Sequence, residues 1–190
     1  MVLPASSPAQ RSICVFCGSR LGSNPAHAAA ARSFGQAIAE QGWRLVYGAG
    51  DVGLMGEVAT AALTGGAPAL GVIPAHLIRR EMRKVDPATF VITENMHERK
   101  KVMFMNSDAV VVLPGGAGSL DEFFEVLTWA QIGLHAKPIF LLDTAGYWQP
   151  LLTLIDHIIA EGFAEPSLRA AVQTPAEVPD LTRLLRVALG

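Results

Sequence analysis

A glutamate that follows a glycine-rich turn is the strongest candidate for chemistry in this sequence. Glu122 stands just after Pro114-Gly115-Gly116-Ala117-Gly118-Ser119, a turn between an apolar strand pattern and a helical pattern. Glycines carry no Cβ atom, so several backbone N–H groups can converge there on one phosphate. A carboxylate beside a sugar phosphate can stabilise positive charge on the sugar ring and orient a water molecule, as glycosidase carboxylates do.

Helix capping offers an alternative interpretation of this turn. Ser119 and Glu122 have the S-x-x-E spacing of a capping box, which is worth about 1 kcal/mol. Capping does not explain three glycines within the four residues that end at Gly118. With Ser119 as the N-cap, Glu122 lies in the first helical turn, where the helix dipole favours the ionised carboxylate.

Arg99 belongs to a basic run, Glu98-Arg99-Lys100-Lys101, near the start of another predicted helix. Solvation of a surface is the ordinary interpretation of such a run. The arginine differs from its lysine neighbours because its planar fork can bind phosphate or ribose oxygens bidentately. His97 and His135 are possible acids or bases, but the five histidines show no metal-ligand spacing, so we expect no catalytic metal.

Two other motifs favour structural roles. The turn Gly48–Gly53 matches G-x-G-x-x-G after a strand, but the next strand ends in Gly71-Val72-Ile73-Pro74, without the carboxylate that a dinucleotide site needs. No P-loop motif indicates an ATPase. Cys14 and Cys17 form a C-x-x-C inside a predicted strand, where residues three apart face opposite sides, so we expect neither a shared metal nor a disulfide.

Short β-branched runs alternate with longer helical patterns along the chain, which predicts an α/β fold: a Rossmann-like, open, mostly parallel sheet with helices on both faces. The predicted strands are Ser12–Cys17, Arg44–Tyr47, Ala69–Ile73, Thr89–Thr93, Ala109–Leu113 and Pro138–Leu142. The predicted helices are Pro25–Glu40, Gly53–Leu63, Met96–Asn106, Ser119–Ile132, Trp148–Ala160 and Glu177–Val187. In such a sheet both glycine-rich turns lie at the strand ends where ligands bind.

Length and charge narrow the possible functions. The chain has 190 residues, a net charge of −2 and 51% hydrophobic residues. We expect a disordered tail over residues 1–11 and one domain over 12–190. The near-neutral charge argues against nucleic acid as a partner, and no apolar run is long enough to cross a membrane. The tail resembles no secretion signal, so we expect a cytoplasmic protein.

Several motifs taken together resemble the Lonely Guy (LOG) family of cytokinin-activating phosphoribohydrolases, often mislabelled as lysine decarboxylases. The family hallmark is P-G-G-x-G-T-x-x-E, and Ser119 here stands where threonine is usual. Ala49 stands where a third glycine is common. The motifs that carry the resemblance are VFCGS (15–19), VYGAGDVGLMG (46–56), GVIP (71–74), MHERK (96–100), PGGAGSLDE (114–122) and TWAQIGLHAKP (128–138).

The resemblance implies hydrolysis of the N-glycosidic bond of N6-modified adenosine 5′-monophosphates, with plain AMP as a further substrate. It implies a catalytic pair, Arg99 and Glu122, a homodimer with pockets near the subunit interface, and no cofactor or metal. The predicted substrate-binding residues are Ser19, Gly50, Met55, Glu81, Lys100, Gly115, Gly116, Ala117, Gly118, Ser119, Leu120, Asp121 and Thr128.

Two other functions stay open at this point. A nucleotide-binding or carrier protein would keep the phosphate turn but perform no chemistry. A pyridoxal-dependent decarboxylase would need a reactive amine, and its candidates are Lys84, Lys100, Lys101 and Lys137, of which Lys100 and Lys137 lie in motifs that the nucleosidase resemblance already explains.

Overall fold

The computed structural model describes residues 10–78 and 90–190. Their core is a sheet of seven parallel strands in the order β4-β3-β2-β1-β5-β6-β7. The strands are β1 (Ser12–Phe16), β2 (Arg44–Tyr47), β3 (Ala69–Pro74), β4 (Phe90–Thr93), β5 (Ala109–Val112), β6 (Ile139–Leu141) and β7 (Val172–Gln173). The predicted Rossmann-like fold is therefore confirmed, and every strand pair in the described residues is parallel.

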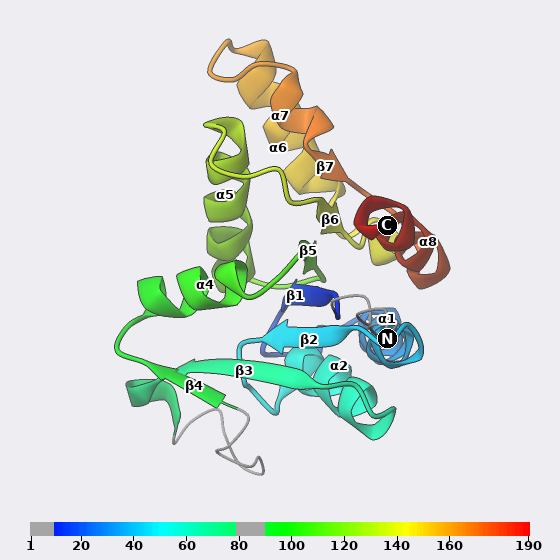
Figure 1. The fold of residues 1–190 in the computed structure, drawn as a ribbon. Coiled ribbons are helices and arrows are strands. Elements are labelled where there is room, and N and C mark those ends of the chain that lie inside the picture. Colours follow the sequence, from blue (N-terminus) through cyan, green and yellow to red (C-terminus); the bar gives the residue numbers. More distant parts are fainter. Residues whose placement is uncertain (1–9, 79–89) are drawn as a thin grey trace, which may run out of the picture.

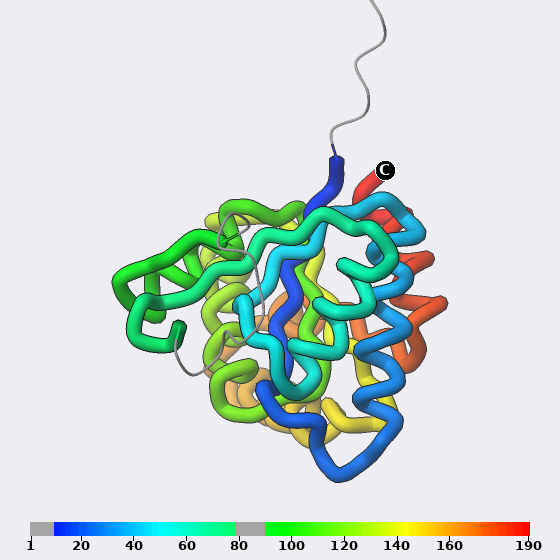
Figure 2. Tube along the Cα trace, turned by 90° about the horizontal axis from the view of Figure 1, so that it is seen from below, coloured from blue at the N-terminus to red at the C-terminus, as the bar shows by residue number. Residues whose placement is uncertain are grey.

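Helices cover both faces of this sheet, as Figures 1 and 2 show. On one face, α1, α2 and α8 pack over β1, β2 and β5, and on the other face α4, α5, α6 and α7 pack over the same sheet. The helices are α1 (Pro25–Glu40), α2 (Gly53–Thr64), α4 (Met96–Met105), α5 (Ala117–Gln131), α6 (Gln149–Ala160), α7 (Ser167–Ala170) and α8 (Val178–Leu189), with short 3-10 turns η1 (Ala75–Leu77) and η3 (Thr144–Gly146).

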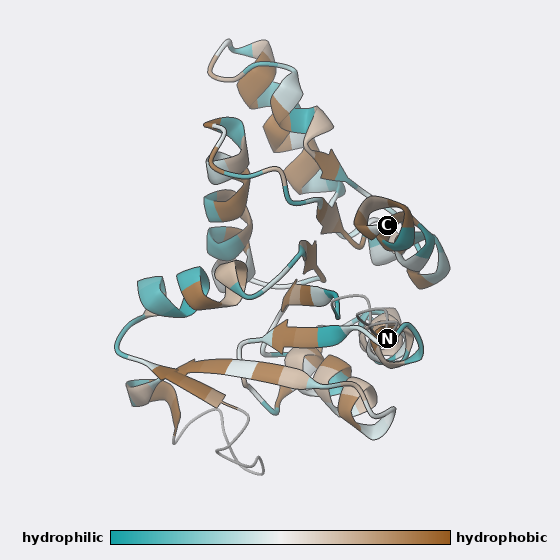
Figure 3. Cartoon of the chain, viewed as in Figure 1, coloured by the Kyte–Doolittle hydropathy of each residue, from teal (hydrophilic) through white to brown (hydrophobic). Residues whose placement is uncertain are grey.

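Strand β1 shows why the sheet needs two helical layers. All five of its residues are buried, and the strands are predominantly hydrophobic in Figure 3. Cys14 packs in the core on the α5 side, whereas Cys17 packs in the core on the α1 side. The two thiols are buried and free. The prediction that the C-x-x-C faces both sides of the sheet is confirmed, although the strand ends at Phe16 rather than at Cys17.

The order in which strands are added to the sheet reverses between β1 and β5, which is the topological switch point. Strands β2, β3 and β4 extend the sheet to one side of β1, and β5, β6 and β7 extend it to the other. Phe16 pairs with Val112 at the carboxyl ends of these two central strands. In open α/β sheets the crevice beyond such a switch point is the usual ligand site.

Most predicted boundaries agree with the structure to within two residues. The short elements β7, α7, η1 and η3 were missed, because two to four residues are too few to show a periodic pattern. The fourth predicted helix was placed in the right segment, but α5 begins at Ala117 rather than at Ser119. Thr89, the expected start of β4, lies outside the described residues.

No helix in the described ranges is long and apolar enough to cross a membrane. The expected cytoplasmic location stays a prediction. So does the tail over residues 1–11, of which only Gln10 and Arg11 belong to the described part of the chain.

Candidate active site

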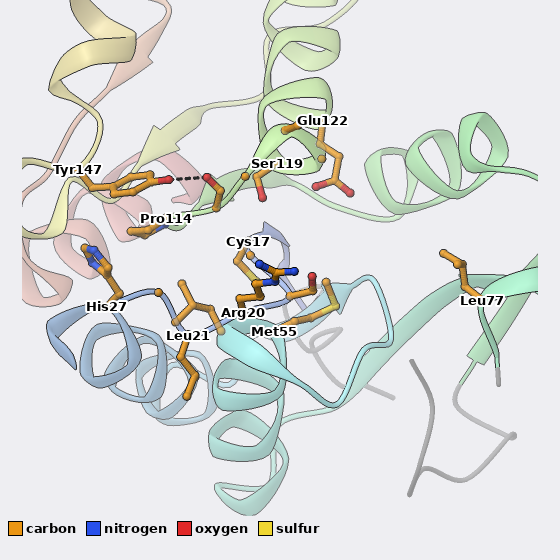
Figure 4. A pocket seen from close by; sticks show the side chains of 18 of the residues that line it. Cys17, Arg20, Leu21, His27, Met55, Leu77, Pro114, Ser119, Glu122 and Tyr147 are labelled. Atoms are coloured by element: carbon orange, nitrogen blue, oxygen red, sulfur yellow. Dashed lines mark hydrogen bonds between the residues drawn. The ribbon is translucent and has the colours of Figure 1, made fainter. Parts of the chain in front are cut away.

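A cavity of about 570 Å³ lies at the switch point, between the loop that follows β1 and the turn that follows β5 (Figure 4). This volume is typical of sites for small organic ligands. The loop after β1 contributes residues 17–22, and the turn after β5 contributes residues 114–119. The cavity thus occupies the place that the strand order alone designates for a ligand.

Two glycines let these two segments lie against each other. The Gly18 amide donates to the Pro114 carbonyl at 3.0 Å. A Cβ atom on Gly18 would lie 3.3 Å from the Gly115 Cα, and one on Gly115 would lie 2.9 Å from the Gly18 nitrogen. Side chains at either position would therefore push the two walls of the cavity apart.

The first turn of α5 opens into the cavity without a cap. Gly116 is the N-cap residue, and no side chain accepts a hydrogen bond from the turn that follows. A Cβ atom on Gly116 or Gly118 would meet no atom within 4 Å. Neither glycine has a positive φ, so the protein's own packing and backbone do not require glycine at these two positions. An anionic ligand close to the amides gives a reason for both.

The capping-box interpretation is wrong, because Ser119 occupies the third position of α5 and is not its N-cap. Glu122 consequently lies in the second turn of the helix. The electrostatic effect of a helix terminus falls off within the first turn. The expectation that the helix dipole keeps Glu122 ionised is therefore wrong, because Glu122 lies beyond the first turn of α5.

Arg99 reaches the cavity from α4, whose start is firmly fixed. The Asn95 side chain accepts from the Glu98 amide at 3.0 Å, and the Glu98 carboxylate accepts from the Glu94 amide at 2.9 Å. Arg99 is only 4% exposed, and its Nη2 donates to the Gly48 carbonyl at 2.9 Å. Surface solvation is therefore the wrong interpretation for Arg99, and its fork is held by the glycine-rich turn that follows β2.

Glu122 extends from α5 into the same cavity and is 8% exposed (Figure 4). Burial raises the pKa of the Cys17 thiol far above its usual range, the Glu122 charge raises it further, and the Arg99 charge lowers it. Glu122 and Arg99 thus both lie close enough to Cys17, in the wall of the same cavity, to affect the pKa of its thiol. Cys17 itself stays protonated and is not a nucleophile.

Lys100 points away from the cavity into an ion-pair cluster between α4 and α5. Its Nζ lies 2.9 Å from Asp121 Oδ2 and 3.0 Å from Glu125 Oε2, and its side chain is 6% exposed. Burial lowers the pKa of Lys100, but the hydrogen bonds to the two carboxylates outweigh burial, so the net shift is upward. The cluster fixes α4 against α5, and with them the neighbouring Arg99 and Glu122.

The structure brings most of the predicted site residues together. Those that line the cavity are Ser19, Met55, Arg99, Gly115, Gly116, Ala117, Gly118, Ser119 and Glu122. Those that do not line it are Gly50, Lys100, Leu120, Asp121 and Thr128. Gly50 lies behind the cavity wall, where its amide donates to the Met55 sulfur at 3.1 Å. Glu81 lies outside the described residues, and its role stays a prediction.

The sequence analysis missed several residues that line the cavity. They include Arg20, Leu21, His27, Leu77, Met96 and Tyr147. Arg20 directly follows the predicted Ser19, so its place in the same loop was a usable signal. The sequence positions of His27 and Tyr147 gave no sign that they lie near Glu122, because His27 belongs to α1 and Tyr147 to the segment after β6.

Amine and metal chemistry find no support among the described residues. Lys100, Lys101 and Lys137 do not line the cavity, and Lys137 instead donates to the Phe104 carbonyl and lies over the Phe104 ring. Lys84 lies outside the described ranges. Within residues 10–78 and 90–190 no group of three or more histidines, cysteines or carboxylates could hold a metal ion.

The strand order, the cavity at the switch point and the uncapped α5 turn define a doubly wound α/β protein with a site suited to a phosphorylated ligand. A family model described as "Possible lysine decarboxylase" matches residues 55–185. The chain belongs to this family, the LOG family, and curated relatives align along nearly its whole length.

Three of these relatives carry enzyme names. Cytokinin riboside 5′-monophosphate phosphoribohydrolase LOG7 of Arabidopsis thaliana is 44% identical, over 91% of this chain and 80% of its own. LOG1 of the same plant is 40% identical, over 91% and 81%. The probable phosphoribohydrolase LOGL1 of Oryza sativa subsp. japonica is 43% identical, over 90% and 77%.

Solved structures support the fold. A molybdenum cofactor binding protein from Rippkaea orientalis superposes with a TM-score of 0.73 over 97% of this chain and 100% of its own, at 22% identity. The Moco carrier protein of Chlamydomonas rheinhardtii gives a TM-score of 0.71 over 96% and 99%, at 20% identity. At these identities the likeness concerns the fold alone.

Proposed function

We propose that this chain is a phosphoribohydrolase that cleaves the N-glycosidic bond of N6-modified adenosine 5′-monophosphates. The products are the free base and ribose 5-phosphate. Relatives that are 40–44% identical over most of both chains are named for this activity on cytokinin riboside 5′-monophosphates. Plain AMP is a further substrate in this proposal, because the roles proposed for the phosphate turn and Glu122 involve only the phosphate and the ribose.

One observation carries the proposal: an uncapped helix start and a buried carboxylate line the same cavity. The α5 turn offers amides to a phosphate, and Gly116 and Gly118 leave room for it. Glu122 lies about one helical turn beyond Gly118 along α5, so a phosphate bound at the turn would place its sugar beside this carboxylate. A carrier needs the phosphate turn, but it has no use for a buried carboxylate beside the sugar.

Glu122 acts on the ribose in this mechanism. As the bond from C1′ to the base nitrogen breaks, the electron pair leaves with the base, and positive charge develops on the ring carbon and oxygen. The Glu122 carboxylate stabilises that charge and orients a water molecule toward C1′. The water oxygen bonds to C1′ and one water proton passes to Glu122. The departing base takes up one proton from solvent, and Glu122 releases its proton to solvent, which restores the carboxylate.

Arg99 positions these groups. Its guanidinium is held by the Gly48 carbonyl and faces the cavity that Glu122 lines. A guanidinium at this place suits the ribose or phosphate oxygens and the Glu122 carboxylate. This division of work needs no cofactor, and we propose that the reaction proceeds without a metal.

The remaining features of the proposal concern the whole protein. Residues 12–190 act as one nucleotide-binding catalytic domain, and the enzyme works as a homodimer. Apolar side chains near the end of α5 support a partner-facing surface, since Ile132 is 62% exposed and Leu134 is 69% exposed. Lys100, Asp121 and Thr128 lie on the α4–α5 side of the molecule, so their proposed substrate contacts depend on that assembly.

The decisive experiment incubates the purified protein with AMP and with N6-isopentenyl-AMP and measures free base by chromatography. We expect base release from the N6-modified nucleotide. Tight binding of the nucleotide without any base release would instead identify a carrier.

Two variants test the roles of the pair. Glu122→Gln keeps size and hydrogen bonding but loses the charge, so kcat should fall by about 10²-fold or more. Arg99→Lys should lose most of kcat/KM, because one ammonium cannot replace the fork. Glu40→Gln, at the exposed end of α1, is the matched control. Near-normal turnover by a folded Glu122→Gln enzyme would remove Glu122 from its role.

A further inference from the structure

We propose that Tyr147 is a positioning residue that orients the phosphate-binding turn. Its hydroxyl holds the Gly115 carbonyl oxygen away from the ligand, so that the amide of the following residue faces the phosphate. The inference rests on the proposed function, because it assumes that a phosphate occupies the turn between Gly115 and Ser119.

The contact joins two segments that are distant in the chain. The Tyr147 hydroxyl donates to the Gly115 carbonyl at 2.6 Å, and Figure 4 shows this bond on the wall of the cavity. Tyr147 follows η3, at the end of the connection from β6 to α6. It lines the cavity together with the turn that it contacts.

Because a peptide unit is planar, the hydrogen bond from Tyr147 fixes the orientation of the peptide between Gly115 and Gly116. No peptide bond in the described residues is cis, so the Gly115 carbonyl and the Gly116 N–H lie on opposite sides of one planar unit. A bond that draws the Gly115 oxygen toward Tyr147 therefore directs the Gly116 N–H away from Tyr147. Gly116 caps α5, so this amide adjoins the unpaired amides of the first helical turn.

The charge consequence favours a phosphate. A carbonyl oxygen that faced the ligand would repel the phosphate oxygens, whereas an N–H donates to them. Gly115 and Gly116 have no side chains of their own to hold this peptide plane. The hydrogen bond from Tyr147 replaces the missing restraint.

The ring of Tyr147 is held from several sides. Ala145 and Gly146 adopt left-handed conformations, with φ of 56° and 70°, and turn the chain sharply just before it. The Asp143 carboxylate accepts from the Trp148 amide at 2.6 Å and closes the same turn. The ring of His27, which is 8% exposed, meets the Tyr147 ring edge-on at 5.3 Å between centroids. A residue in a strained turn with packed neighbours is suited to precise placement.

A positioning role and a purely structural role make different predictions. Tyr147 is 39% exposed, so water can replace its hydroxyl as a donor to the Gly115 carbonyl in a variant that lacks the hydroxyl. Removing the hydroxyl should therefore cost little stability. The main effect of removing the hydroxyl should therefore fall on the affinity for phosphorylated ligands. Turnover of the bound substrate should change little, because Glu122 and Arg99 keep their places.

The test compares Tyr147→Phe with the wild type in two measurements. Calorimetric titration with ribose 5-phosphate, a product of the proposed reaction, reports binding without turnover. Titration with AMP reports nucleotide binding, and free base is measured in the same samples so that hydrolysis is not mistaken for binding. Steady-state hydrolysis of N6-isopentenyl-AMP separates KM from kcat. The matched control is Thr153→Val, which deletes an exposed hydroxyl that donates to the Gln149 carbonyl at 2.9 Å on α6, outside the cavity.

We expect Tyr147→Phe to raise Kd for ribose 5-phosphate about 3- to 10-fold, and KM in parallel, with kcat within about twofold of wild type. Thr153→Val should leave all three unchanged. An unchanged Kd in Tyr147→Phe, or a fall in kcat at constant Kd, overturns the positioning role.

The two proposals can fail separately. A wild type that binds AMP but releases no base, together with a weakened Tyr147→Phe, refutes the hydrolase and supports the positioning role. A wild type that hydrolyses the nucleotide, with equal Kd in the variant, refutes only the positioning role. A wild type that binds neither ribose 5-phosphate nor AMP refutes both.

Discussion

The two glycine-rich turns of this protein look alike in sequence but meet different surroundings. In the turn after β2, a Cβ atom on Gly48 would lie 1.8 Å from Arg99 Nη2, and one on Gly53 would lie 2.2 Å from the Ser19 backbone. In the turn after β5, a Cβ atom on Gly116 or Gly118 would meet nothing within 4 Å. The glycines of the turn after β2 are required by contacts within the protein. Gly116 and Gly118 of the turn after β5 instead leave space into which a ligand can fit.

The role of a glycine motif therefore depends on which atoms a side chain at each glycine would contact. The turn after β2 matches a dinucleotide fingerprint, yet its residues 48–53 do not line the cavity. They place Arg99 and the start of α2 instead. Even Ala49 there adopts a left-handed φ of 62°, which accounts for the frequent glycine at this position in the family.

The largest effect should come from Gly53→Ala in the protein-shaping turn. Gly53 has φ of 62° and no room for a Cβ atom, so both backbone strain and overpacking oppose the change. We expect the free energy of unfolding to fall by about 2–4 kcal/mol in urea denaturation. The control is Gly42→Ala, where φ is 67° but nothing lies within 4 Å, so it should lose only about 1 kcal/mol. Equal losses would deny that packing shapes this turn.

Gly48→Ala should damage catalysis more than folding. The new methyl group would displace the Arg99 guanidinium, and a misplacement of about 1 Å can cost up to about 10²-fold in rate. We expect kcat/KM to fall by about 10- to 100-fold. A double-mutant cycle with Arg99→Lys checks the cause, since the Gly48 effect should largely vanish in that background. Full additivity would show that Gly48 acts by another route.

Gly118→Ala should separate ligand space from protein packing in the second turn. Alanine favours a helix, so stability should stay equal or rise by up to about 0.5–1 kcal/mol. The methyl group points into open space beside the proposed phosphate, so KM should rise about tenfold. Gly115→Ala is the counterpart, because its Cβ strikes Ser119 and should destabilise the fold. An unchanged KM in Gly118→Ala would argue that no ligand approaches there.

The smallest effect concerns the ion pairs that join α4, which carries Arg99, to α5, which follows the turn after β5. The pKa of Lys100 is raised in the folded state, so its protonated form stabilises the fold below the unfolded pKa of about 10.4. That contribution is lost as pH rises through the higher folded pKa. Asp121 is 61% exposed, so the effect should not exceed about 1 kcal/mol.

Urea unfolding of wild type and Lys100→Met between pH 8 and pH 11 measures this contribution. The wild type should lose stability relative to the variant over the alkaline end of the range. Parallel curves across the whole range would mean that the Lys100 ion pairs add nothing to the fold.

Much of the architecture could be predicted from local patterns. The six longer strands and the main helices follow from runs of β-branched residues and from helical spacing, which neighbouring residues impose on each other. Glu122 and the glycines before it lie within eight residues of the chain, so their association was visible as well. The start of α5 could not be predicted, because the same letters serve as a capping box or as the first helical turn.

The partners of the site residues could not be predicted in the same way. Lys100 was expected to bind substrate, but its nearest charges, on α5, are the two carboxylates that it pairs with. Tyr147 contacts a residue 32 positions away, and His27 contacts Tyr147 from the first helix. Such contacts depend on the order of strands in the sheet, which no local pattern encodes.

The amino-acid sequence by itself determined the family, the α/β succession of elements and the glycine–glutamate motif, because all three are properties of adjacent residues. The tertiary structure decided which glycines make room for a ligand, which basic residue enters the cavity and which tyrosine holds the turn. These outcomes arise where β1 and β5 lie side by side and the segments after them meet. Only the folded sheet brings those distant segments within contact distance of one another.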